Sequence, residues 1–222
     1  MEALTVDYKS FGSFFVNNGS DIIAWRAKKF LTKEPTTLEW LQSLEPDSIL
    51  VDIGANIGVF SIYASIFKNV NCIAFEPEYS NLYLLKKNII LNSLSNKINV
   101  YPLSISDKNN LNFLHLSSLE TGSALHSISQ NDLELTDEKA KVVMKIGTYS
   151  LTIDEFVKQA GIKPNMLKID TDGNEVEILR GAKETLSSVD YIAMEMPVNL
   201  KKKDECLKIM KDNLYEPIEN LQ

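Results

Sequence analysis

The stretch Val51-Asp52-Ile53-Gly54-Ala55-Asn56-Ile57-Gly58-Val59-Phe60 decides the fold of this chain. It starts inside a short apolar run from Ile49 to Ile53, which is typical of a buried strand. A Gly-x-Asn-x-Gly turn follows, and a helical pattern then continues to about Phe67. Glycines let the backbone come close to a ligand, and the start of a helix offers free N–H donors. The stretch therefore predicts a ligand site at the turn between a strand and a helix.

Composition excludes several classes of protein. The 222 residues include 23 Lys and Arg against 30 Asp and Glu, so the formal net charge is -7. Such a chain lacks the basic surface of a general nucleic-acid binder or of a protein held on an anionic membrane. No run approaches the roughly 20 apolar residues of a membrane helix, and the N-terminus does not resemble a signal peptide. Cys72 and Cys206 form no CxxC pair, which favours a reducing compartment. We expect a soluble, cytoplasmic protein without nucleic-acid or membrane partners.

Strand and helix patterns alternate along most of the chain. Five apolar runs are predicted as strands, at residues 49–53, 71–75, 98–105, 166–169 and 191–194. Helical patterns follow four of them, at residues 59–67, 79–91, 174–186 and 202–212. This alternation predicts an α/β fold with a mostly parallel, doubly wound sheet and helices on both faces.

Two regions fall outside this alternation. Residues 1–45 are irregular apart from a short helical pattern near Leu38 to Leu44, and we interpret them as an N-terminal extension packing on the core. Residues 46–222 form the predicted main domain. Within it, residues 107–150 contain two further strand patterns around a polar loop, a β-rich insertion of the kind that often builds the substrate side of a site.

Acidic residues follow the predicted strands and point to a nucleoside ligand. Glu76 ends the second strand, 24 residues after Asp52. A carboxylate there can accept a hydrogen bond from each of the two hydroxyls of a ribose. The third glycine of a dinucleotide fingerprint is missing after Gly58, and the carboxylate of Asp52 would repel a pyrophosphate. Asp52 instead suits a cationic or amino-bearing ligand. Asp107, after the third strand, is placed to reach an adenine amino group or to start a turn.

Four sequence blocks in chain order carry a family resemblance: residues 51–58, Phe75-Glu76-Pro77, residues 103–107, and Leu167-Lys168-Ile169-Asp170-Thr171-Asp172-Gly173-Asn174-Glu175 with residues 178–181. Together they resemble the FkbM family of S-adenosylmethionine-dependent methyltransferases, from about Glu34 to about Glu195. The resemblance implies a Rossmann-like class I methyltransferase fold, S-adenosyl-L-methionine as cofactor, and O-methylation of a sugar or other small hydroxylated metabolite. The family more usually has Glu where Asp172 stands.

The resemblance also implies roles for single residues. Gly54, Asn56 and Gly58 would line the methionine part of the cofactor, with Asp52 near its amino group. Glu76 would hold the ribose and Asp107 the adenine, and Asp170 would also border the cofactor.

Candidates for catalysis are fewer. Asp170 ends the fourth strand and is the best placed residue to take the proton of an acceptor hydroxyl; a turn-capping aspartate is the structural alternative. His126, in the insertion, is a second candidate base, although loop histidines are more often surface residues. Asp172 and Glu175 form a capping-box pattern.

Three alternatives stay open at this level. Asp170, Glu195 and Asn199 are oxygen ligands that would suit Mg²⁺, although a metal is not required. A nicotinamide-dependent oxidoreductase shares the strand–turn–helix pattern, and a methyltransferase-like binding domain without catalysis would keep it. The acceptor and the oligomeric state cannot be derived from the sequence.

Overall fold

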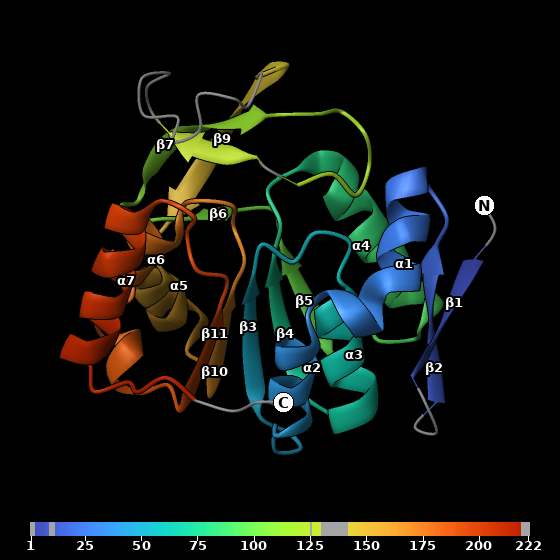
Figure 1. Cartoon of the computed structure of the whole chain (residues 1–222), viewed down its shortest axis with the longest axis horizontal. Coiled ribbons are helices and arrows are strands. Elements are labelled where there is room, and N and C mark those ends of the chain that lie inside the picture. Colours follow the sequence, from blue (N-terminus) through green and yellow to red (C-terminus); the bar gives the residue numbers. More distant parts are fainter. Residues whose placement is uncertain (1–2, 9–11, 125, 130–141, 219–222) are drawn as a thin grey trace. The chain divides into compact units, whose positions relative to one another are not determined.

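The computed structural model describes residues 3–8, 12–124, 126–129 and 142–218, and these form two compact units (Figure 1). The first unit holds the described residues up to Pro102 together with Leu119–Ser123. The second holds Leu103–Ser118 and the described residues from Ala124 onward. Within the predicted insertion, residue 125 and residues 130–141 lie outside the described residues. The predicted boundary between residues 45 and 46 falls inside the first unit and stays a prediction.

The first unit contains parallel strands joined by helices: β3 (Ile49–Ile53), α3 (Val59–Lys68), β4 (Asn71–Phe75), α4 (Tyr79–Leu91) and β5 (Ile98–Tyr101). Strand β4 pairs in parallel with β3 and with β5, as Figure 1 shows. Four of the five residues of β3 and of β4 are buried, as expected of strands covered on both faces. These strand–helix–strand connections confirm the predicted α/β, Rossmann-like fold with mostly parallel strands.

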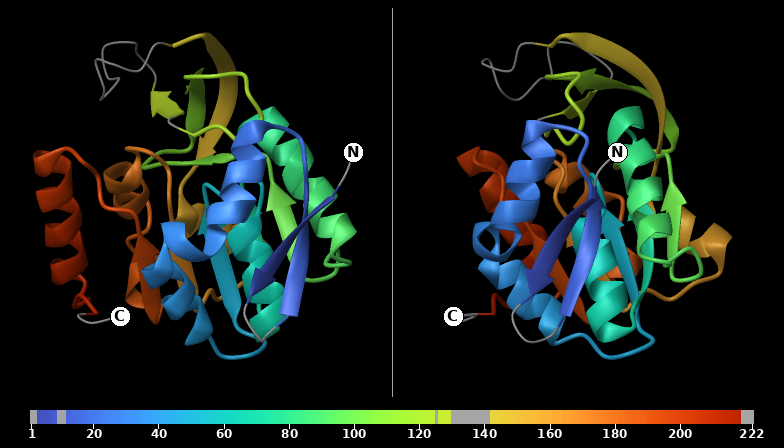
Figure 2. Two further views of the ribbon diagram at one scale, coloured as in Figure 1. Left: turned by 45° about the vertical axis from the view of Figure 1, so that its right-hand side comes forward. Right: turned by 90° about the vertical axis from the view of Figure 1, so that its right-hand side faces the viewer.

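The N-terminal residues are more regular than their sequence indicated. They form the hairpin β1 (Ala3–Tyr8) with β2 (Gly12–Asn17), followed by α1 (Asp21–Lys33) and α2 (Pro35–Gln42). Strand β2 contacts α3 and α4, and Figure 2 shows the dark-blue hairpin beside them. The ring of Phe30 in α1 lies 5.2 Å from that of Phe14 and 5.5 Å from that of Phe60. Aromatic packing of this kind ties the N-terminal residues to α3.

Two asparagines of α4 and its C-terminal end complete the attachment of the hairpin. The side-chain amide of Asn92 bonds to both backbone groups of Phe15. Its Oδ1 accepts from the Phe15 amide at 2.8 Å, and its Nδ2 donates to the Phe15 carbonyl at 2.7 Å. Asn88 is fully buried; its Oδ1 accepts from the amide of Asn17, and its Nδ2 donates to the carbonyl of Ile57 in the glycine turn. The hairpin and the turn are therefore both held by one helix.

The second unit contains two groups of strands, and its elements are β6 (Ser104–Ile105), β7 (Asn110–Leu116), β8 (Ser127–Ser129), β9 (Met144–Leu151), α5 (Ile153–Ala160), β10 (Met166–Ile169), α6 (Glu175–Arg180), η2 (Thr185–Ser187), β11 (Tyr191–Met194) and α7 (Leu200–Asp212). Strands β10 and β11 pair in parallel. The others form a sheet in the order β6-β9-β7-β8, in which β7 and β9 are antiparallel. Strands β7 and β9 confirm the two strand patterns predicted on the two sides of the polar loop.

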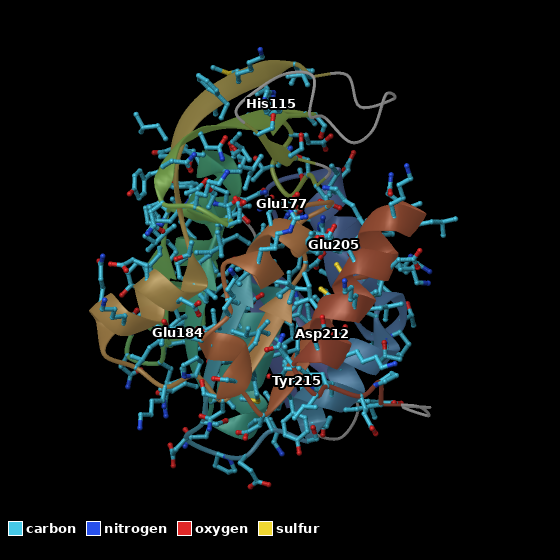
Figure 3. The ribbon with its side chains drawn as sticks, turned by 90° about the vertical axis from the view of Figure 1, so that its left-hand side faces the viewer. His115, Glu177, Glu184, Glu205, Asp212 and Tyr215 are labelled. Carbon is cyan, nitrogen blue, oxygen red and sulfur yellow. The ribbon has the colours of Figure 1, made fainter. Side chains whose placement is uncertain are left out.

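Two predicted elements are shorter than expected. The strand predicted at residues 98–105 is divided into β5 and β6 at Pro102, which has no N–H to continue a ladder. The helix predicted at residues 174–186 ends at Arg180, before Gly181. A Cβ at Gly181 would overlap the Ser106 carbonyl oxygen, so the backbone here comes too close for a side chain. Further on, the Tyr215 hydroxyl, labelled in Figure 3, donates to the carbonyls of Leu186 and Val189.

Candidate functional site

The glycine turn after β3 has an unusual backbone shape. Gly54, Asn56 and Gly58 all have positive φ, at 80°, 51° and 86°. The amides of Gly54 and Ala55 both donate to the carbonyl of Phe75, at 3.0 and 2.9 Å. Because Phe75 is the last residue of β4, the turn is fixed to the end of the neighbouring strand. Hydrogen bonds therefore connect the carboxyl ends of β3 and β4. In open α/β sheets, ligands bind at this edge.

Gly58 is required at its position for two reasons. Its φ of 86° disfavours any residue with a Cβ, and a Cβ there would overlap Leu85 Cδ1 in α4. The absence of a side chain lets α3 begin directly against α4.

We expect Gly58→Ala to lower the free energy of unfolding by about 2–5 kcal/mol, combining the cost of a left-handed residue with that of overpacking. Gly161→Ala is the matched control, because Gly161 also has positive φ, at 64°, but apart from its own chain neighbours none of the described residues lies within 4 Å of the place that an alanine Cβ would take. It should lose only about 1–2 kcal/mol. Urea denaturation measures both losses; equal losses in the two variants would contradict the packing argument.

Glu76 follows β4 and binds the glycine turn directly. Its Oε2 accepts from the Asn56 amide at 2.8 Å and its Oε1 from the Glu78 amide at 2.9 Å. The side chain is buried, and only 5% of the residue is exposed. The pKa of Glu76 is raised to about 7, mainly because the carboxyl is buried; the two amide bonds oppose this rise, and the nearby charges of Glu78 and Asp52 add to it. Each carboxylate oxygen can accept a further hydrogen bond, so the group can still bind a diol.

A raised carboxyl pKa makes the folded state bind a proton that the unfolded chain has lost. Between about pH 4.5 and pH 7, the contribution of Glu76 to the free energy of unfolding should therefore fall as pH rises, by about 3 kcal/mol in total. We expect wild type to lose stability relative to Glu76→Gln over this interval. Denaturant titrations of both proteins from pH 4.5 to about pH 8 measure the difference, and parallel pH profiles would contradict the prediction.

Asp52 provides a second buried carboxylate beside the turn. Only 1% of the residue is exposed, and its Oδ2 accepts from the Ser61 hydroxyl of α3 at 2.6 Å. The charge of Asp52 is felt at Glu76, whose pKa it raises. The first unit thus brings together Asp52, Gly54, Asn56, Gly58 and Glu76, five of the residues predicted for the cofactor.

Asp170 follows β10 in the second unit and is paired with a lysine. Lys168 Nζ lies 3.2 Å from Asp170 Oδ2, and the side chains are 4% and 25% exposed. A buried ammonium of this kind needs a charged partner, and Asp170 supplies one. The Asp170 side chain is nevertheless partly exposed. A residue that contacts an acceptor must be accessible in this way.

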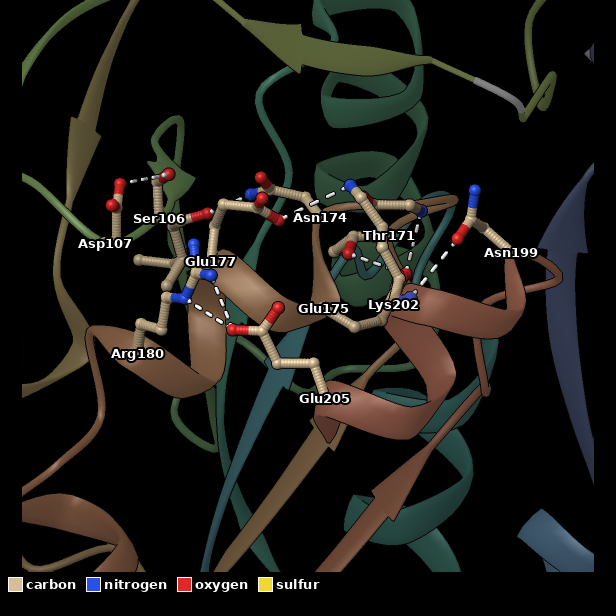
Figure 4. Close-up of polar contacts among 12 residues, drawn as sticks. Ser106, Asp107, Thr171, Asn174, Glu175, Glu177, Arg180, Asn199, Lys202 and Glu205 are labelled. Carbon is tan, nitrogen blue, oxygen red and sulfur yellow. Dashed lines mark hydrogen bonds and ion pairs between the residues drawn. The ribbon is translucent and has the colours of Figure 1, made fainter. Parts of the chain in front are cut away.

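The turn after Asp170 is held by Glu175 and Lys202 (Figure 4). Glu175 Oε1 accepts from the Thr171 hydroxyl at 3.1 Å and from the Gly173 amide at 2.9 Å, and Lys202 Nζ donates to the Gly173 carbonyl at 2.5 Å. The predicted capping box is wrong: Asn174 is the N-cap of α6, and Glu175 is its first helical residue. The carboxylate of Glu175 stabilises the preceding turn instead.

The same helices carry further polar contacts. Figure 4 shows Arg180 of α6 paired with Glu205 of α7, with Nη2 and Oε1 2.5 Å apart. Lys202 also pairs with Glu177 at 3.6 Å. Glu177 and Glu205 are labelled on the two helices in Figure 3. These pairs fix α7 against α6, and with it the lysine that holds the turn after Asp170.

The magnesium alternative finds no support. Asn199 is the N-cap of α7, and its Oδ1 accepts from the amides of Lys201 and Lys202. Asp170 is paired with Lys168. In the part of the chain that the structure describes, no three or more His, Cys, Asp or Glu residues gather as a metal site would require.

Asp107 and His126 also lie in the second unit. Asp107 is near Gly181 and forms a long ion pair of 4.0 Å with Lys108. His126 Nδ1 accepts from the Ser117 amide at 3.3 Å, so the proton of the neutral ring is on Nε2. The role of His126 as a base stays a prediction. His115, labelled on β7 in Figure 3, is 2% exposed, and its Nε2 lies 3.1 Å from the Ser129 hydroxyl.

Comparison with known proteins decides the family. A family model described as the methyltransferase FkbM domain matches residues 52–217, which is well over half of the chain. The chain belongs to the FkbM methyltransferase family. The predicted family is confirmed, and the matched range contains both Asp52 and Asp170.

Two proteins similar to this FkbM-family chain are named methyltransferases. The hexuronic acid methyltransferase AglP of Haloferax volcanii is 27% identical over 181 residues, which are 81% of this chain and 69% of AglP. The methyltransferase sdnD of Sordaria araneosa is 26% identical over 65% of this chain and 64% of its own length. Among solved structures, a precorrin-6y C5,15-methyltransferase of Geobacter metallireducens has a TM-score of 0.47 at 16% identity, covering 85% of this chain and 76% of its own.

One part of this FkbM-family site was not found from sequence. Leu119–Ser123, here called the 119–123 segment, belongs to the first unit although it lies in the predicted insertion. Asn56 Nδ2 donates to the Ser123 carbonyl at 2.9 Å, and Asn81 of α4 binds the segment twice, through Ser123 and Gly122. Asn81 is 1% exposed. Because its partners lie about 40 residues further along the chain, no local pattern marks it.

Among the described residues, no helix combines the length and the apolar character needed to cross a bilayer.

Proposed function

We propose that the protein transfers a methyl group from S-adenosyl-L-methionine to a hydroxyl group of a sugar or other small hydroxylated metabolite. One observation carries the proposal: a buried carboxylate, Glu76, is bound through the Asn56 amide to a glycine turn that also has the buried carboxylate of Asp52 beside it. Family membership supports the same reaction class.

The residues of the first unit fit the chemistry of this cofactor. A ribose diol donates hydrogen bonds, and Glu76 is an acceptor with free lone pairs. A sulfonium and an ammonium are cations, and Asp52 is buried next to the turn. The turn residues Gly54, Asn56 and Gly58 would line the methionine part. Outside this unit, the family resemblance assigns Asp107 to the adenine. When bound, the cofactor supplies a methyl carbon activated by its positive sulfur.

Asp170 is the proposed proton acceptor. An acceptor hydroxyl must lose its proton as its oxygen bonds to the methyl carbon, and a positioned carboxylate can take that proton. The Lys168 ammonium at 3.2 Å compensates the charge of Asp170 and orients its carboxylate. Alignment of the hydroxyl with the methyl carbon supplies much of the remaining acceleration.

Sugars with a carboxylate are the first acceptors to test, because the relative AglP is named a hexuronic acid methyltransferase. The assay incubates the protein with S-adenosylmethionine and with uronic acids, neutral sugars or small polyols, and detects a gain of one methyl group by mass spectrometry. We expect a methylated product and a rise in melting temperature with S-adenosylhomocysteine.

The outcomes separate the alternatives. Binding of NAD without binding of S-adenosylhomocysteine would favour the nicotinamide-dependent oxidoreductase, against which the family match speaks. Binding of S-adenosylhomocysteine without any methylated product across the panel would favour a methyltransferase-like binding domain. Failure of S-adenosylhomocysteine to bind would refute the proposed function.

A further inference from the structure

Arg26 in α1 is held at the 119–123 segment by one nitrogen only. Its Nε donates to the Gly122 carbonyl at 2.8 Å. Within the described residues, Arg26 has no other hydrogen bond and no ion pair, and none of these residues occupies the two terminal nitrogens of its guanidinium. Nε orients the planar group, and the terminal N–H groups form the fork that binds carboxylates.

This guanidinium lies close to the glycine turn. Gly122, which accepts from Arg26, directly precedes Ser123, whose carbonyl accepts from Asn56 Nδ2 at 2.9 Å. Arg26 and the turn residue Asn56 therefore donate to the carbonyls of two consecutive residues, Gly122 and Ser123. All of these residues belong to the first unit.

The position of Arg26 is set by several bonds that do not involve its charge. Asn81 holds Gly122 and Ser123 from α4, and the Ser20 hydroxyl at the start of α1 donates to the Thr121 carbonyl at 2.7 Å. Helix α1 also packs tightly on the segment, because a Cβ at Gly122 would lie 2.9 Å from Ile23 Cγ1. These bonds hold in place a cation that has no charged partner among the described residues, and such preorganisation favours ligand binding.

The charges around the turn indicate which ligand group is missing a partner. Asp52 and Glu76, both buried there, match the cationic and diol groups of the proposed cofactor. The methionine part also has a carboxylate, and neither acidic residue can bind it. A guanidinium fork is the best match for that group.

We propose that Arg26 is a carboxylate-binding residue of the cofactor site and recognises the methionine carboxylate of S-adenosylmethionine. This inference rests on the proposed function. It assigns to the N-terminal residues, outside the range matched by the family model, a direct part in cofactor binding.

The test compares S-adenosylmethionine with its decarboxylated form, which keeps the sulfonium and the ammonium. Isothermal titration measures both Kd values for wild type, Arg26→Met and Arg26→Lys. Arg26→Met should weaken S-adenosylmethionine binding about 10- to 100-fold, the loss of a charge-assisted pair. Binding of the decarboxylated form should change less than about threefold, and Arg26→Lys should be intermediate because lysine restores the charge without the fork.

Two control variants separate recognition from structure. Lys29→Met removes an exposed cation from the same helix, and S-adenosylmethionine binding should stay within about twofold of wild type. Ser20→Ala removes the bond to Thr121 and the N-cap bond to the Ile23 amide but leaves the guanidinium, so it should affect both ligands equally and weakly. If Arg26→Met weakened both ligands to the same degree, Arg26 would be a structural residue and the inference would be overturned.

The remaining outcomes are equally decisive. Unchanged S-adenosylmethionine binding in Arg26→Met, with a raised KM for an acidic acceptor but not for a neutral one, would assign the carboxylate to the acceptor and overturn the inference. If wild type binds neither S-adenosylmethionine nor S-adenosylhomocysteine, the proposed function itself fails. Wild-type binding with an unaffected Arg26→Met variant refutes only the role of Arg26.

Discussion

Glu76→Gln should weaken binding of S-adenosylhomocysteine by about 100-fold or more, the largest effect expected on the cofactor side. Both carboxylate oxygens accept backbone amides, from Asn56 at 2.8 Å and Glu78 at 2.9 Å. An amide side chain has one oxygen, so its NH₂ group must face one of these N–H donors. The variant therefore loses acceptors for the ribose and also repels the turn amide or the Glu78 amide.

The measurement is isothermal titration at about pH 8, where wild-type Glu76 is ionised, with circular dichroism to verify the fold. Glu78→Gln is the matched control. Glu78 is also buried, and its Oε2 accepts from the Asn81 amide as the N-cap of α4. Its loss should lower the melting temperature and change the Kd by less than about fivefold, since only a cap is weakened. Equal losses of affinity in the two variants would contradict the assignment of Glu76 to the ribose.

Asp170→Asn should lower kcat by about 100- to 10,000-fold, the range that general-base catalysis contributes. The Kd for S-adenosylmethionine should change by less than about threefold, because a residue that acts only on the acceptor proton contributes little to cofactor binding. The substitution keeps the shape of the side chain, and asparagine can still accept from Lys168 Nζ through its oxygen. Steady-state kinetics with the best acceptor and titration with the cofactor separate the two quantities.

Asp172→Asn is the control for the loss of one negative charge in the same turn. Asp172 is exposed and has a φ of 55°, which asparagine tolerates well. Its kcat should stay within about threefold of wild type. A large increase in the cofactor Kd for Asp170→Asn would place Asp170 in the cofactor site, the second role predicted for it. Wild-type kcat in Asp170→Asn would exclude it as the base.

The regular core could be predicted because its signals are local. The apolar runs at β3, β4, β10 and β11 and the amphipathic stretch of α4 have the bounds expected from the sequence. Each run is bordered by residues that end it, such as Gly54 after β3 and Pro77 after β4. Strand period, helix period and turn chemistry all agree in these places, and such agreement makes an element predictable.

Elements whose boundaries depend on distant partners were missed. The hairpin of β1 and β2 was missed although apolar and polar residues alternate from Leu4 to Tyr8, because two short strands are stable only when packed on other elements, and the sequence does not identify those elements. The break between β5 and β6 separates strands that pair with different neighbours, β4 and β9. The early end of α6 follows from the close approach of Gly181 to Ser106, which lies far earlier in the chain.

The sequence by itself determined the strand–turn–helix unit and the acidic residue after β4, because backbone preferences of glycine and the strand and helix periods act over a few residues. Only the tertiary structure decided how polar groups far apart in sequence are satisfied. Asn81 binds the 119–123 segment to α4, Asn88 binds the hairpin to the turn, and Arg26 reaches Gly122 across 96 positions. Buried polar groups need partners but do not specify them locally, since any correctly oriented donor or acceptor satisfies them.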